Sequence, residues 1–235
     1  AALLVGLGYR DGPYPFPPRP FSWRLAGDVV RERRWRLATG GYLGHMFELY
    51  SAWTWLPVFI AASLAAAGHT DTHSTSVASA VAFAALAIGG AGCVWGGLVA
   101  DRRGRAWLVT VAMAVSGTGA LVIGLTFGRS LWIVVPLALT WGFFVIADSA
   151  QFSVLVTESV PPHAVGTALT VQTSLGFLLT MVTIQLIPHM AQLASWRWAF
   201  AVLALGPAAG IWSIRRLASL AANSAPGSQE SAAHQ

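Results

Sequence analysis

Lysine is absent from this sequence of 235 residues, and charged residues of every kind make up only 10% of it. A water-soluble domain carries about a quarter charged residues, so this chain lacks the polar surface that would let it face water on all sides. Apolar residues account for 55% of the chain instead. These proportions exclude an ordinary soluble domain and indicate an integral membrane protein.

Cysteine is almost absent as well, because Cys93 is the single example and lies inside an apolar run. This excludes a disulfide framework and a cysteine-based metal site. The sequence also lacks the H-E-x-x-H, G-x-S-x-G and P-loop patterns, so we expect no enzyme, no cofactor and no metal. His69, Asp71 and His73 share one predicted loop, where we expect them to be solvated rather than to bind a metal.

Long apolar segments are what the sequence has in abundance. A membrane-spanning helix needs about 20 residues, and the sequence predicts six spans, an all-α membrane protein. We expect residues 1–8 to be the end of a preceding span and residues 9–37 to be a cytoplasmic linker rich in Pro and Arg, ending in a short basic helix over 23–36. The spans fill residues 38–216, and residues 217–235 are expected to be a disordered cytoplasmic tail. The six apolar segments cover approximately 38–66, 76–99, 106–127, 131–157, 166–188 and 196–214.

The arginines are distributed unevenly between the two sides of the predicted spans. Twelve of the fourteen fall in the linker, in the break at 101–105 or directly after the last span. Arg129 and Arg197 are the two on the opposite side. Because Arg accumulates on the cytoplasmic side of membrane proteins, both ends of the chain are expected in the cytoplasm. The basic charge therefore predicts orientation, not nucleic-acid binding.

The most specific motif, GGLVADRRGRAW, lies between the second and third spans. It resembles the cytoplasmic loop signature of the major facilitator superfamily, G-x-x-x-D-R-x-G-R followed by Arg or Lys, and departs from it at Ala106. We expect Gly97 to let the helix end approach a neighbour and Gly104 to permit a tight turn. The matching residues, which we expect to form a cytoplasmic gating loop, are Gly97, Asp101, Arg102, Gly104 and Arg105.

The resemblance implies more than a loop. Members of this superfamily have twelve spans in two six-helix halves joined by a long cytoplasmic linker, and here a basic linker precedes six spans. The chain is therefore similar to the C-terminal half of such a transporter, with a missing N-terminal half as its partner. The resemblance implies alternating-access transport of a small solute. We expect this transport to be proton-coupled, by symport or efflux, and the protein to lie in a bacterial cytoplasmic membrane. The alternative is a non-transporting membrane scaffold, or an accessory or degenerate fragment of a transporter.

Ionisable side chains inside spans are costly and mark functional sites. His45 and Glu48 share one face of the first span, and Asp148 lies in the fourth. We expect Glu48 or Asp148 to bind a proton or a cationic group in a polar cavity, with hydrogen bonds from His45, Tyr42, Gln151 and Gln172. Structural roles remain the alternative for both acids. Trp53 and Trp55 fit either the aromatic belt at the membrane surface or stacking on a substrate.

Overall fold

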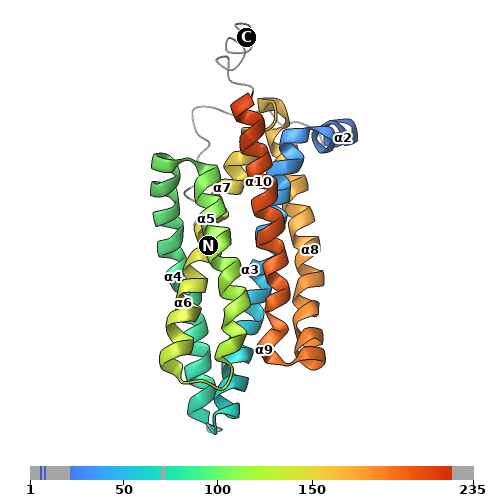
Figure 1. Cartoon of the computed structure of the whole chain (residues 1–235). Coiled ribbons are helices and arrows are strands. Elements are labelled where there is room, and N and C mark those ends of the chain that lie inside the picture. Colours follow the sequence, from blue (N-terminus) through green and yellow to red (C-terminus); the bar gives the residue numbers. More distant parts are fainter. Residues whose placement is uncertain (1–5, 7, 9–21, 70–71, 224–235) are drawn as a thin grey trace, which may run out of the picture.

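The structure, a computed structural model, describes residues 6, 8, 22–69 and 72–223. Every regular element in these residues is a helix, and no strand forms among them. The predicted all-α fold is confirmed (Figure 1). In chain order the elements are α2 (Trp23–Arg31), α3 (Arg33–Ala66), α4 (Thr72–Arg103), α5 (Arg105–Ile123), η1 (Gly124–Thr126), α6 (Leu131–Ala147), α7 (Ser149–Thr157), η2 (Pro162–Ala164), α8 (Val165–Ala194), α9 (Trp196–Ala199), η3 (Ala201–Ala204) and α10 (Leu205–Asn223).

Six stretches of helix are long and apolar enough to cross a membrane. Four of these stretches combine neighbouring elements: α5 with η1, α6 with α7, η2 with α8, and α9 with η3 and α10. The six predicted spans are therefore present, one for each apolar segment of the sequence.

The helices form an elongated bundle in which α3 has the central place (Figure 1). α3 packs against α10, α8 and α4, while α6 packs against α4 and α5, and α5 also contacts α10. Side chains on α3 can therefore meet groups from almost every other span.

Glycines on one face of α4 allow this helix to lie very close to α6. A Cβ atom added at Gly92 or Gly96 would collide with backbone carbonyl groups of α6. This is the close contact that a stripe of small residues permits between membrane helices. Gly97 does not take part, because an added Cβ there would meet nothing within 4 Å. The expectation that Gly97 provides a close helix approach was wrong, and its neighbour Gly96 provides it instead.

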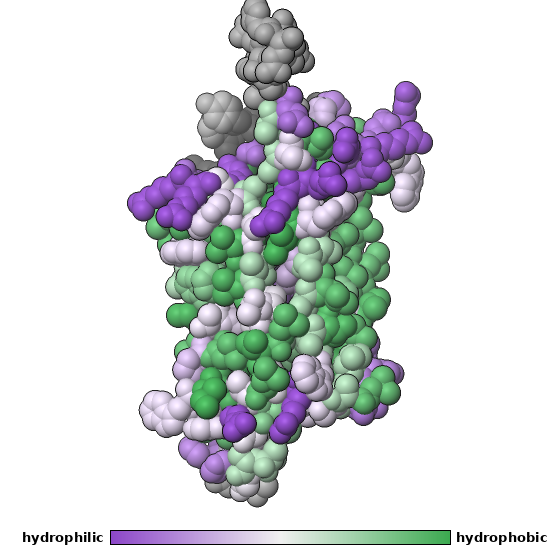
Figure 2. Space-filling view, in the orientation of Figure 1, coloured by the Kyte–Doolittle hydropathy of each residue, from purple (hydrophilic) through white to green (hydrophobic). Residues whose placement is uncertain are grey.

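Arginines gather at one end of the bundle, which is formed by the start of α3, the turn between α4 and α5 and the last turns of α10. We call this the arginine-rich end. Figure 2 shows hydrophilic residues gathered there and a broad hydrophobic belt below them. Gly104 alone joins α4 to α5, with a φ of 86°, so this residue makes the predicted tight turn.

Helix boundaries at this end differ from the sequence prediction. α3 begins at Arg33 rather than at 38, because Glu32 caps it by accepting a hydrogen bond from the Arg34 N–H at 3.2 Å. α10 continues to Asn223, so the disorder expected from residue 217 does not apply to 217–223; Leu217 is buried there in a cluster with Trp35. The short basic helix ends at Arg31. The expected remnant of a span at 1–8, the Pro-rich part of the linker and the tail beyond 223 lie essentially outside the described residues.

Candidate functional site

Glu48 lies where three spans converge in the interior of the bundle. It extends from α3, is 1% exposed, and has a hydrogen-bond donor at each carboxyl oxygen. The Ser116 hydroxyl of α5 donates to Oε2 at 2.8 Å, and the Trp141 indole N–H of α6 donates to Oε1 at 2.6 Å. A buried polar group without partners is costly, so these two donors make the position of Glu48 tenable.

The sequence around these donors explains how they reach Glu48. Gly119 lies against the Trp141 ring, and an added Cβ at this glycine would come within 2.9 Å of it. The missing side chain therefore makes room for the indole between α5 and α6. Ser116 Oγ also lies 3.4 Å from the Met113 carbonyl oxygen, one turn earlier in α5. The serine hydroxyl thus has two acceptors within reach.

His45 and Asp148 form a second buried pair, one helical turn from Glu48. His45 Nδ1 lies 3.0 Å from Asp148 Oδ1, and the side chains are 3% and 2% exposed. The pair is an ionic contact, and Asp148 Oδ1 has no hydrogen-bond partner among the described residues. The Phe152 ring covers the histidine, with ring centroids 5.2 Å apart.

Asp148 occupies the break between α6 and α7. It ends α6 and precedes α7, and its side chain makes no capping hydrogen bond to α7. The carboxylate is instead directed at His45 of α3. An Asp at a helix break commonly caps the next helix, and that structural role is not the one found here.

His45, Glu48 and Asp148 act as one electrostatic group. Glu48 interacts electrostatically with both of the other side chains, in addition to its two hydrogen bonds. Burying a net charge in a low-dielectric interior is costly. The three side chains therefore place ionisable groups of α3 and of the α6–α7 break next to one another in the interior.

The other three predicted site residues are not part of this group. Tyr42 adjoins it through an edge contact with Phe152, at 6.0 Å between centroids. Gln172 is buried on α8, and its Nε2 has no hydrogen-bond partner among the described residues. Gln151 points the other way, because its Oε1 accepts a hydrogen bond from Arg105 at 3.4 Å.

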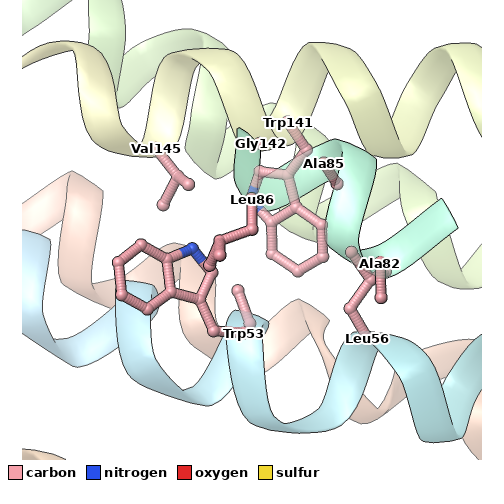
Figure 3. A pocket seen from close by; sticks show the side chains of 9 residues that line it. Trp53, Leu56, Ala82, Ala85, Leu86, Trp141, Gly142 and Val145 are labelled. Carbon is pink, nitrogen blue, oxygen red and sulfur yellow. The ribbon is translucent and has the colours of Figure 1, made fainter. Parts of the chain in front are cut away.

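A small cavity lies behind Trp141, between α3, α4 and α6. Its volume is about 30 Å³, which is enough for about two water molecules. Figure 3 shows the Trp53 and Trp141 rings on either side of it, with Leu86 between them. Trp53 is therefore a wall of this cavity. Trp55 instead ties α3 to α8, because its indole N–H donates to the Ile184 carbonyl at 2.8 Å.

In the predicted gating loop, Arg105 makes the ion pair and the side-chain hydrogen bonds to another span among the described residues. Arg105 pairs with Glu158, the residue after α7, at 3.3 Å, and it also donates to Gln151. Asp101 is exposed and has no ion pair or hydrogen bond among the described residues. Arg102 is exposed as well. The structure therefore does not pair Asp101 with Arg105, and it is Arg105 that connects α5 to α7.

Sequence reasoning missed Ser116, Trp141 and Glu158. The first two belong to apolar segments and had no local signal, because their role depends on which spans become neighbours. Glu158 stood in a predicted loop as an acid opposite an Arg-rich turn, which was the available signal. Among the three loop residues considered for a metal, Asp71 lies outside the described residues.

Comparison with known proteins agrees with this architecture. The family model described as Major Facilitator Superfamily matches residues 2–184. The match includes α2 to α7 and most of α8. No curated protein matches the chain. Six apolar helices are the content of one half of such a transporter, and the chain belongs to the major facilitator superfamily of membrane transporters.

Proposed function

We propose that this chain is the C-terminal half of a secondary transporter that moves a small solute by alternating access, and that Glu48 carries the coupled proton. The observation that supports this most directly is the pair of hydrogen bonds on Glu48. A buried carboxyl group can serve transport only if it can change protonation without losing its partners.

Ser116 gives Glu48 this ability. When Glu48 is ionised, the serine hydroxyl donates to Oε2 at 2.8 Å. When Oε2 holds a proton, the carboxyl group donates to the serine oxygen, and the serine hydroxyl turns to the Met113 carbonyl oxygen at 3.4 Å. The indole N–H of Trp141 can only donate, and it stays on Oε1 in both states. Both protonation states are therefore satisfied without any shift of the backbone.

The His45–Asp148 pair would sense the same event. Protonation of Glu48 removes a negative charge that repels the Asp148 carboxylate and attracts a positive charge on His45. Asp148 stands at the α6–α7 break, and α7 leads to the Arg105–Glu158 pair. We infer that the proton site and the loop are connected through α7.

The charge of the interior also bears on the solute. The buried charged groups of the described residues are two acids and a histidine, and no arginine is among them. This composition favours a proton or a cationic solute over an anion in this half. We place the arginine-rich end in the cytoplasm, with the protein in a bacterial cytoplasmic membrane and a second six-helix half as its partner.

Infrared difference spectroscopy of the full chain in lipid vesicles tests the proton site directly. Between high and low pH, a carbonyl-stretch band from a buried protonated carboxylic acid is expected to appear. Glu48→Gln removes that band, and Ser116→Ala shifts it because the hydrogen bond to Oε2 is lost. Glu158→Gln is the matched control, since Glu158 is an exposed glutamate, and it leaves the band unchanged. If Glu48→Gln leaves the band in place, Glu48 is not the proton carrier.

Transport is tested with the chain and the other half of the transporter together in proteoliposomes. Solutes are screened for uptake with and without a proton gradient, and then Glu48→Gln and Asp148→Asn are compared with the parent. Loss of the gradient dependence in Glu48→Gln supports the proposal. Unchanged coupling in both variants refutes it, and no transport of any solute would favour a non-transporting scaffold.

A further inference from the structure

A basic groove lies between α3 and α10 at the arginine-rich end. Its volume is about 490 Å³, and it is separate from the buried acidic group. One wall comes from the first two turns of α3 and the other from the middle of α10. The lining residues are Arg33, Arg36, Leu37, Trp212, Ser213 and Arg216.

The groove carries three guanidinium groups and no acid. None of its lining residues is Asp or Glu, and Arg33, Arg36 and Arg216 have no ion pair among the described residues. Arg216 lies over the Trp212 ring, 5.9 Å from its centroid. Stacking of this kind orients a guanidinium while leaving its N–H groups free to bind a planar or tetrahedral oxyanion.

The floor of the groove is fixed by a close contact between its two helices. An added Cβ at Gly40 would lie 2.6 Å from the Ser213 hydroxyl oxygen. α3 and α10 are therefore in tight contact one turn below Arg36. The three arginines of the groove lie above this contact, at the end of the bundle where α3 begins.

The neighbouring groove at the same end shows what a compensated basic site looks like. It is lined by Arg34, Arg103 and Arg105, among others, but also by Glu158. Glu158 pairs with Arg105 there. The groove between α3 and α10 has the same kind of basic wall without an internal counter-charge.

We propose that the groove between α3 and α10 binds the phosphate headgroup of an anionic phospholipid. The three arginines supply the charge and the N–H donors that phosphate requires. Trp212 is 60% exposed, and Leu37 lies beside it in the groove. A tryptophan with an apolar neighbour at this level is suited to the boundary between headgroups and hydrocarbon. A lipid contacts both the arginines and the two apolar side chains of the groove, whereas a free phosphate contacts only the arginines. Basic pockets between membrane helices are known to hold anionic headgroups.

Native mass spectrometry of the full chain in detergent tests this. The chain is titrated with phosphatidylglycerol, with phosphatidylcholine and with phosphatidylglycerol in the presence of inorganic phosphate. We expect phosphatidylglycerol to bind at one saturable site, phosphatidylcholine to bind much more weakly, and inorganic phosphate not to displace the lipid at equal concentration.

The variant Arg36→Gln/Arg216→Gln removes two groove charges from exposed positions. An arginine near an anionic lipid contributes about fivefold to affinity, so the double variant is expected to bind about 25-fold more weakly. The matched control is Arg31→Gln/Arg215→Gln, which has the same net charge but alters exposed arginines outside the groove. Equal losses of phosphatidylglycerol affinity in the two double variants would rule out the groove as the binding site. Equal binding of phosphatidylcholine, or displacement by inorganic phosphate, would overturn the anionic lipid as its occupant.

Discussion

Replacing Trp141 by Phe isolates the hydrogen bond on which the position of Glu48 depends. Phe keeps an aromatic ring at this buried position but removes the indole N–H that lies 2.6 Å from Oε1. A hydrogen bond to a charged group contributes about 1.5–3 kcal/mol to stability. The smaller ring also leaves a cavity, at a cost of about 1 kcal/mol. We expect Trp141→Phe to lower the free energy of unfolding by about 2.5–4 kcal/mol.

Trp35→Phe is the matched control, because Trp35 has the same burial and its indole N–H also donates a single hydrogen bond. Its acceptor is the neutral carbonyl of Ala168, at 3.3 Å. A neutral pair contributes about 0.5–1.5 kcal/mol, and the ring loss is the same as at Trp141. The excess cost of Trp141→Phe over Trp35→Phe is therefore expected to be about 1–2 kcal/mol.

The assay is denaturant unfolding in mixed micelles, followed by far-ultraviolet circular dichroism, with each substitution made in the parent and in Glu48→Gln. Trp141→Phe and Glu48→Gln should be non-additive by about 1 kcal/mol, because Gln keeps an oxygen that accepts from the indole N–H but removes the charge that strengthens this bond. Trp35→Phe should be additive with Glu48→Gln to within about 0.5 kcal/mol. Additivity in both pairs, together with equal costs of the two Trp substitutions, would refute the reasoning.

Three further predictions concern the helix contacts and the loop. Gly96→Ala places a Cβ against the α6 backbone and should destabilise the fold by about 1–3 kcal/mol. Gly97→Ala faces open space and should be neutral or stabilise the fold by up to about 1 kcal/mol. The same unfolding assay compares these adjacent positions, and equal effects would contradict the α4–α6 contact. Gly104→Ala forces a side chain into a backbone conformation with a φ of 86° and should cost about 1–3 kcal/mol of unfolding free energy, so an unchanged midpoint would argue against this turn. Arg105→Gln and Glu158→Gln should each lower the free energy of unfolding by at most about 1 kcal/mol, because the pair is partly exposed. Both losses of stability should be smaller in high salt. A loss in only one of the two variants would show that the ion pair is not its cause.

The sequence was sufficient for the architecture because the hydrophobic effect dictates it. Each apolar segment is long enough to span a bilayer and became one span. The family could be recognised because the loop motif keeps its Gly, Asp and Arg at fixed spacing. These features are local, so a single chain displays them.

The partners of the buried groups could not be read from the sequence in the same way. His45 and Glu48 were visible as ionisable residues inside a span, but Ser116 and Trp141 lie far from them in the sequence and look like ordinary membrane residues. Only the tertiary fold, in which α6 packs against α5 and contacts α3, brings them together. The same applies to Asp148: the residues around it fit a continuous helix, and the break became visible only with the tertiary contact to His45.

The break at Asp148 makes α7 a short separate helix at the end of the fourth span. α7 has nine residues, and at 1.5 Å per residue the helix measures about 15 Å from Asp148 to Glu158, the residue that follows it. A tilt of about 10° around Asp148 would displace Glu158 by about 3 Å. This displacement is enough to separate two side chains that lie 3.3 Å apart. A change of charge beside His45 that tilts α7 is therefore expected to weaken the contact between Arg105 and Glu158.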